Sequence, residues 1–386
     1  MTESACTNCV SLQGGNGKAI IMEERTNTNT SKTTYTTTNK AKKEGMLRAA
    51  CEGVESLVCT SSGRKRLARE HVVAAQSGAA AHAAEGLVFG GYVTACLERN
   101  RKLNRYTDVL PYEDTRVVLS NASKYINASH VVPGYRPRHE GLVRFIATQG
   151  PLQTTVGDFW QMCYEMKAPR IVMLTQVSET AMAGSKCYAY FPVKNRHEQT
   201  VECRDEGLRV WMEEEEEHEE DDAMIVSRKI VLEKTSTSCT NDGNGDRNEP
   251  AEVSETRMRL EHLHFTGWPD HGVPSSTTDF LRLLFEAQLV PRSPDDFDTY
   301  MAGVNASSGP VVVHCSAGIG RTGTLCCVVM MLQEVLASGE FDESLPRITL
   351  EHLRTQRPRM VERPEQYIFA VLALRDLLRI YLHQCR

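Results

Sequence analysis

The sequence predicts an α/β fold, and three observations lead to this prediction. Val311–Val313 is β-branched and apolar, which indicates a short buried strand. From Thr322 to Ala337 apolar residues recur at helical spacing, and Gly339 is a residue suited to end the helix. Residues 201–260 alternate with a period of two, as antiparallel strands do, and Ile171–Leu174 is a further apolar run of strand length. We therefore expect a β-sheet combined with helices.

The turn between the predicted strand and helix carries the strongest chemical signal. It is rich in glycine, and five residues separate Cys315 from Arg321. A strand, glycine-rich turn and helix aim backbone N–H groups and the positive end of the helix dipole into one concavity, which favours a bound anion and a thiolate. The planar guanidinium of Arg321 can hold two phosphate oxygens. The turn thus has what nucleophilic attack on a phosphate ester needs, whereas a structural cysteine in a tight turn is the alternative.

Composition limits the class of protein and its partners. Lys and Arg number 44 against 50 for Asp and Glu, and this net charge of −6 argues against nucleic-acid binding. The longest apolar run, Leu325–Leu332, is too short to span a bilayer, and no secretory signal is recognised, so we expect no membrane insertion. Thirteen cysteines without paired spacing favour a reducing compartment. We expect a soluble cytoplasmic protein and interpret Arg64–Arg66 as a solvated linker, with nuclear import as the alternative.

The chain is predicted to have one folded domain after a low-complexity region. Residues 1–84 contain Thr/Asn/Ser/Lys tracts and Ala-rich stretches, which bury too little apolar surface to offset ordering entropy. We expect them to be mostly disordered, with at most one docked helix, and to add little to turnover. The domain is placed at 85–386. Polar inserts at about 213–222 and 235–250 are expected to be solvated loops, with metal binding at the acidic one as the alternative.

His314-Cys-Ser-Ala-Gly-Ile-Gly-Arg-Thr-Gly323 resembles the signature loop of the classical, phosphotyrosine-specific protein tyrosine phosphatases. The segments Leu103–Val109, His264–Pro274 and Leu353–Tyr367 resemble three further motifs in that family's order, so the resemblance covers about 85–386. It implies a strongly twisted mixed β-sheet flanked by helices. It also implies a single-domain, non-receptor enzyme that hydrolyses phosphotyrosine in proteins through a cysteinyl phosphate, without metal or cofactor.

The resemblance also implies roles for individual residues. Asp270 would be the general acid, because a phenolic leaving group departs more easily when it receives a proton. Tyr106 would flank the substrate ring, and Asp108 would bind the substrate's backbone amides. The implied catalytic residues are Cys315, Arg321, Asp270, Gln366, Thr322 and His314. The implied substrate-binding residues are Ser316, Ala317, Gly318, Ile319, Gly320, Arg321, Tyr106, Asp108, Lys186, Asp270 and Gln366, with support from Glu179, Trp268, Pro269 and Glu362.

Two positions depart from the family pattern. Glu362 stands where the family has a glutamine, and we expect repulsion from the phosphoenzyme to turn its side chain away and leave Gln366 to position water. Arg359 stands where a second phosphate pocket would need open space.

Alternative functions are a dual-specificity or lipid phosphatase, which would lack the Tyr106 wall, and an inactive phosphotyrosine-binding module. The expected partners are phosphotyrosine-containing proteins, and we expect a monomer.

Overall fold

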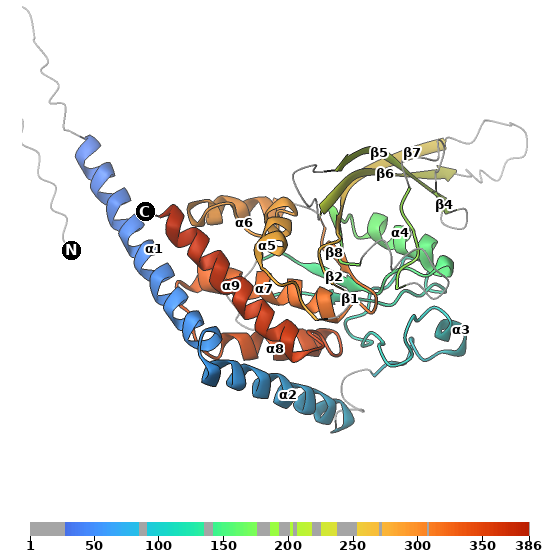
Figure 1. Cartoon of the computed structure of the whole chain (residues 1–386). Helices are drawn as coiled ribbons and strands as arrows, with labels where there is room; N and C mark the ends of the chain where they lie inside the picture. Colours follow the sequence, from blue (N-terminus) through green and yellow to red (C-terminus); the bar gives the residue numbers. More distant parts are fainter. Residues whose placement is uncertain are drawn as a thin grey trace, which may run out of the picture. The chain divides into compact units, whose positions relative to one another are not determined.

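The computed structural model describes residues 28–84, 91–134, 142–175, 186–192, 201–203, 207–217, 225–237, 253–269, 272–306 and 309–385. Residues 43–386 form one compact unit, and residues 1–42 form another. The described part of the shorter unit, from Thr28 on, is helical. The larger unit contains a sheet with helices around it (Figure 1).

A twisted mixed sheet lies at the centre of the larger unit. Within the described ranges it has eight strands in the order β1-β2-β8-β3-β7-β6-β5-β4. β2, β8, β3 and β7 run parallel to one another, and the remaining neighbours are antiparallel. The strands are β1 Ala128–Val131, β2 Phe145–Thr148, β3 Arg170–Met173, β4 Val201–Cys203, β5 Leu208–Glu217, β6 Ile225–Thr237, β7 Val253–Phe265 and β8 Val311–His314. The mixed α/β fold predicted from the sequence is therefore confirmed.

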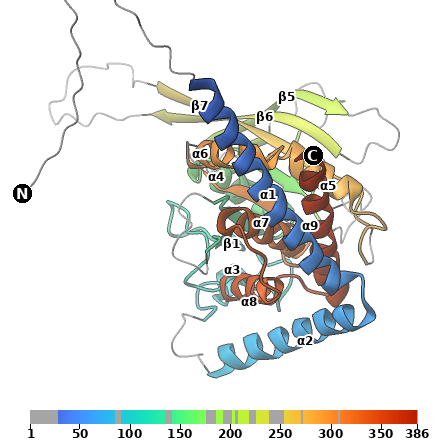
Figure 2. The same cartoon turned by 90° about the vertical axis from the view of Figure 1, so that its left-hand side faces the viewer.

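Alternate side chains of β8 enter two cores because successive residues of a strand face opposite sides. Val311 and Val313 pack in a core with α5, α7, α8 and α9, and Val312 packs in a second core with α4. Figure 2 shows the α7 to α9 group from a second direction. The helices are α3 Glu98–Arg101, α4 Val156–Glu165, α5 Thr278–Glu286, α6 Phe297–Ala306, α7 Gly320–Ser338, α8 Leu345–Gln356 and α9 Pro364–Gln384, with 3-10 turns η1 Gln153–Thr155 and η4 Pro294–Asp296. In the ranges that the structure covers, no helix has the length and apolar character to cross a membrane.

The N-terminal region differs from the prediction. α1 spans Thr28–Val58 and α2 spans Ser61–Ala84, and from Lys43 on they belong to the larger unit. Leu47, Val54 and Leu67 are fully buried in the core shared with α9. The expectation of mostly disordered residues up to 84 is wrong for this part. The average composition is polar, but Leu47, Val54 and Val58 recur at helical spacing and give the helix one apolar face.

The acidic insert also begins later than predicted. Glu213–Glu217 belong to β5, and Thr235–Thr237 belong to β6. Cations on β6, the adjacent strand, and on β7, the next one, offset the charge, as in the ion pairs Glu213–Arg259 (2.9 Å), Glu214–Lys229 (2.6 Å) and Glu215–Arg228 (3.1 Å). The rest of both predicted inserts lies outside the described residues.

Candidate active site

The loop after β8 is shaped by glycines that admit no side chain. Gly318 has a φ of +72°, and a Cβ there would lie 2.1 Å from the carbonyl oxygen of Thr148 on β2. The amide of Gly150 donates to the carbonyl of Ser316 at 2.8 Å, which ties the loop to the end of β2. Cys315, at the start of this loop, is 5% exposed. The loop therefore holds the thiol at the carboxyl end of a central parallel strand.

A buried arginine binds the outer side of this loop. The guanidinium of Arg357 donates to the carbonyls of Gly318 (2.8 Å) and Ala317 (3.0 Å) and to Asn127 Oδ1 (2.9 Å). Because C=O and N–H point in opposite directions across a trans peptide, the amides of these two peptide groups point away from Arg357. Burial lowers the pKa of Arg357 to about 10, so it stays charged at neutral pH. Arg357 thus fixes the orientation of the predicted anion cradle.

Cys315 opens into a cavity of about 330 Å³. One wall is Tyr106, whose hydroxyl lies 2.8 Å from Ser316 Oγ. Arg105 anchors this wall, since its side chain donates to the carbonyls of Gly150 (3.0 Å) and Pro151 (2.8 Å). The cavity is lined by Tyr106, Asp108, Val109, Lys186, Gly272, Cys315, Ser316, Ala317, Gly320, Arg321, Arg359, Glu362, Arg363 and Gln366. The structure thus brings together ten of the predicted site residues from distant segments.

Arg321 joins the signature loop to the segment before Asp270. Its guanidinium donates to the carbonyls of Leu174 (2.8 Å) and Pro269 (3.1 Å). Trp268 is fully buried against α5 and α9 and donates from Nε1 to the carbonyl of Gly272 at 3.3 Å. Asp270 itself, like Glu179 and its predicted pairing with Arg321, lies outside the described residues. In the sequence, Asp270 directly follows Pro269, which contacts Arg321, and comes two residues before Gly272, which lines the cavity.

His314 and Thr322 lie beneath the loop and do not line the cavity. The ring of His314 is buried, with Nε2 2.6 Å from the hydroxyl of Tyr190 and Nδ1 3.2 Å from the carbonyl of Cys315. Burial lowers the pKa of His314 to about 3, so the ring is neutral at physiological pH. Thr322 is also buried, and within the described part of the chain its hydroxyl has no hydrogen-bond partner.

Charged residues on one side of the cavity are linked in a chain. Arg359 bridges Asp108 (2.6 Å) and Glu362 (3.0 Å). Glu362 was expected to turn away from the site, yet it lines the cavity, because Arg359 offsets its charge. Gln366 accepts from the amide of Arg363 at 3.2 Å and also lines the cavity. Asp108, the predicted ligand of substrate amides, is therefore engaged by Arg359.

The sequence pattern that defines the family described as Protein-tyrosine phosphatase matches residues 100–376. The chain belongs to the protein-tyrosine phosphatase family. It is 37% identical over 273 residues to human tyrosine-protein phosphatase non-receptor type 13, and the match covers 70% of this chain and 9% of that protein. It is 33% identical over 289 residues to mouse tyrosine-protein phosphatase non-receptor type 20, with coverages of 73% and 56%.

A third relative, Protein-tyrosine-phosphatase PTP1 of Arabidopsis thaliana, is 33% identical over 287 residues, covering 72% of this chain and 71% of the relative. The chain thus spans a small part of the first relative and about half of the second.

Sequence reasoning did not foresee several residues that organise this protein-tyrosine phosphatase site. Arg357 and Arg105 act through backbone carbonyls far away in the sequence, and no local pattern indicates such contacts. Tyr190 also went unnoticed, although it contacts His314 and lies 2.8 Å from His262 Nε2. Gly318 and Ile319, predicted to bind substrate, are not among the residues that line the cavity; their carbonyls accept from Arg357 and from the amide of Val361.

Proposed function

We propose that this chain is an enzyme that hydrolyses phosphotyrosine in proteins through a cysteinyl-phosphate intermediate. The observation that carries the proposal is that Cys315, Arg321 and Tyr106 line one cavity at the carboxyl end of β8. A thiol beside a guanidinium provides a nucleophile and an anion site, and the Tyr106 wall deepens the cavity enough for a phenyl ring. Membership of the protein-tyrosine phosphatase family supports the same activity.

In the first proposed step the Cys315 thiolate attacks the phosphorus atom. A sulfur–phosphorus bond forms and the bond from phosphorus to the phenolic oxygen breaks. Arg321 and the loop amides hold the non-bridging oxygens, where charge develops in the transition state. Asp270 donates a proton to the departing phenolic oxygen. Its position between Pro269 and Gly272, which lie against Arg321 and the cavity, supports this role.

In the second proposed step water cleaves the phosphocysteine. Water attacks phosphorus, the sulfur–phosphorus bond breaks, and inorganic phosphate leaves. Gln366 positions this water, since its amide both donates and accepts hydrogen bonds, while Asp270, now a carboxylate, takes the water's proton. Thr322, whose buried hydroxyl has no hydrogen-bond partner among the described residues, donates a hydrogen bond to the thiolate that leaves. The Asp108 carboxylate binds substrate amides after it leaves Arg359.

Two further parts of the proposal concern the setting of the enzyme. We place it in the cytoplasm, as a monomer that acts on phosphotyrosine-containing proteins. Support for a reducing compartment comes from the sequence, whose thirteen cysteines lack the paired spacing of a disulfide framework. Gel filtration with light scattering measures the oligomeric state.

Turnover of matched phosphopeptides tests the proposed activity. The same peptide is offered with phosphotyrosine, phosphoserine or phosphothreonine, with and without a metal chelator. We expect release of phosphate from the phosphotyrosine peptide alone, unaffected by chelator and abolished in Cys315→Ser. Comparable turnover of phosphoserine would favour a dual-specificity enzyme. Binding of the phosphotyrosine peptide without turnover would favour the inactive binding module.

A further inference from the structure

Helix α2 contacts a loop that lines the candidate site. It lies outside the range matched by the protein-tyrosine phosphatase pattern, which begins at residue 100. Its residue His71 is only 4% exposed and contacts the loop formed by residues 359–363, which carries Arg359 and Glu362 into the cavity. An element that precedes the matched region thus reaches the back of a loop that lines the site.

His71 and Arg354 together hold one peptide group of this loop. His71 Nε2 lies 2.8 Å from the carbonyl oxygen of Val361 and 2.9 Å from Arg354 Nη2. Arg354 also donates to the carbonyls of Val361 (3.0 Å), Met360 (3.0 Å) and His71 (3.2 Å). A neutral imidazole nitrogen either donates or accepts, so each tautomer satisfies one of the two contacts of Nε2. Burial, and next the positive charge of Arg354, lower the pKa of His71, so the ring is neutral at pH 7.

The held peptide group needs such support because the loop adopts an unfavourable backbone conformation. Arg359 and Val361 have φ values of +59° and +54°. A β-branched residue rarely adopts this region, and such conformations persist where the surroundings enforce them. The amide of Val361 donates to the carbonyl of Ile319 in the signature loop at 3.0 Å, and its carbonyl faces His71 and Arg354. That carbonyl belongs to the peptide bond joining Val361 to Glu362, so the contact fixes the position of the backbone nitrogen of Glu362.

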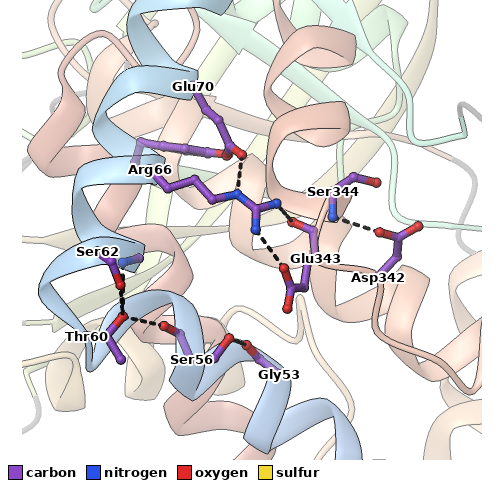
Figure 3. Close-up of polar contacts among 11 residues, drawn as sticks. Gly53, Ser56, Thr60, Ser62, Arg66, Glu70, Asp342, Glu343 and Ser344 are labelled. Atoms are coloured by element: carbon purple, nitrogen blue, oxygen red, sulfur yellow. Dashed lines mark hydrogen bonds and ion pairs between the residues drawn. The ribbon is translucent and has the colours of Figure 1, made fainter.

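A separate surface contact docks the start of α2. Figure 3 shows Arg66 between Glu70 on the same helix and Glu343 just before α8. Arg66 Nη1 lies 2.6 Å from Glu343 Oε2, and Nε lies 2.9 Å from Glu70 Oε1. Exposed ion pairs such as these contribute little to stability. Leu67, fully buried, supplies the apolar part of the docking. Leu67 shares its core with Met360 and Val361, but among the described residues neither Arg66 nor Leu67 forms a side-chain hydrogen bond or ion pair with the 359–363 loop. Both residues therefore serve as controls for the hydrogen bond of His71.

We propose that His71 is a positioning residue for the 359–363 loop, so that helix α2 helps set the geometry in which water attacks the phosphocysteine. The proposal rests on the proposed function and deepens it. His71 is buried and is not among the residues that line the cavity, so it acts through the Val361 carbonyl on Glu362 and, one turn further, Gln366. Its loss releases the loop from its strained conformation. The phosphoryl transfer to Cys315 depends on the signature loop and is affected less.

Two amide substitutions separate positioning from bulk packing. The Gln side chain is long enough to place its terminal amide where His71 Nε2 lies, whereas Asn places its amide near the Nδ1 position. We expect His71→Gln to keep steady-state turnover within about twofold of wild type. His71→Asn and His71→Ala should lower it about tenfold, as misplacement of a reacting group by a fraction of an ångström does. Rapid mixing with an activated aryl phosphate should show a burst rate changed by less than about threefold in all three.

Arg66→Ala and Leu67→Ala are the controls. Leu67→Ala destabilises α2 packing, and its urea midpoint is compared with that of His71→Asn. We expect Leu67→Ala, although less stable, to keep wild-type turnover at temperatures where it remains folded. Equal turnover of His71→Gln and His71→Asn, or a loss in Leu67→Ala equal to that in His71→Asn, would overturn the proposal. An inactive wild-type protein would instead refute the proposed function, so the two failures are distinguishable.

Discussion

Replacing Arg357 by Met should damage the anion cradle while leaving its cysteine and Arg321 in place. Arg357 is fully buried and makes hydrogen bonds to the carbonyls of Ala317 and Gly318 and to the side chains of Asn127 and Ser129. Each buried carbonyl left without a donor costs about 1–3 kcal/mol. Because burying the charge of Arg357 is itself unfavourable, its removal offsets part of this loss in stability. We therefore expect a loss of about 2–4 kcal/mol in the free energy of unfolding.

The same substitution should weaken anion binding, because the two carbonyls become free to reorient and their peptide N–H groups turn with them. We expect the affinity for inorganic phosphate, measured by competition against an aryl phosphate, to fall at least about tenfold, equivalent to about 1.4 kcal/mol. Urea unfolding measures the stability change. Arg379→Met is the matched control, since Arg379 forms a surface ion pair with Glu55 (2.7 Å) whose loss should cost no more than about 1 kcal/mol.

A folded Arg357→Met protein with phosphate affinity within about twofold of wild type would refute this reasoning, which ties the cradle to Arg357. Should Arg357→Met fail to fold, Arg357→Lys offers the same test. Lys keeps the charge but cannot supply the planar set of donors that the four acceptors require.

Other predictions follow from the charged rim, the buried histidines and the N-terminal helices. Arg359→Ala should lower KM for a phosphopeptide without acidic residues by up to about fivefold, because substrate amides no longer have to displace the ion pair between Arg359 and Asp108, which is worth at most about 1 kcal/mol. KM for a small aryl phosphate, which has no such amides, should be unchanged. Glu362→Gln should raise steady-state turnover and shrink the burst; neither change would be seen if Glu362 were a bystander. Burial lowers the pKa of His314 to about 3, so between about pH 6.5 and 3 the unfolded chain binds a proton that the folded protein does not. The free energy of unfolding should therefore decrease as the pH is lowered through this window, by up to about 1.4 kcal/mol per pH unit for each such ring. Urea midpoints should decrease with it, and a pH-independent midpoint would contradict this. Deletion of residues 1–42 should leave the urea midpoint unchanged, whereas deletion of 1–84 should yield an unstable or insoluble protein; wild-type stability of the shorter chain would be the contrary result.

Local signals explain what the sequence could predict. The run Val311–Val313, the glycines after Cys315 and the helical apolar spacing up to Gly339 each act over a few residues, and β8, the loop and α7 formed as expected. The resemblance to one family then placed distant residues such as Tyr106 and Gln366 in the same cavity. Neither the local patterns nor the family resemblance requires knowledge of which distant residues are in contact.

The missed features depend on such contacts. Arg357 lies 39 residues from Gly318, and His71 lies 290 residues from Val361, so neither partner is visible in the local sequence. The acidic run was interpreted as a solvated loop because its charges were considered alone. Arg259 on β7 and the cations of β6 make Glu213–Glu217 acceptable in a strand. Polar composition likewise concealed the apolar stripe of α1 and α2.

Trapping of the covalent intermediate tests the central claim most directly. The enzyme is mixed with a phosphotyrosine peptide, quenched in acid within milliseconds and digested, and the phosphorylated fragment is identified by mass spectrometry. The account predicts one phosphoryl group on Cys315, formed at the rate of the burst and absent in Cys315→Ser. Full turnover with no phosphocysteine in the burst phase, or with the phosphoryl group on another residue, would contradict it.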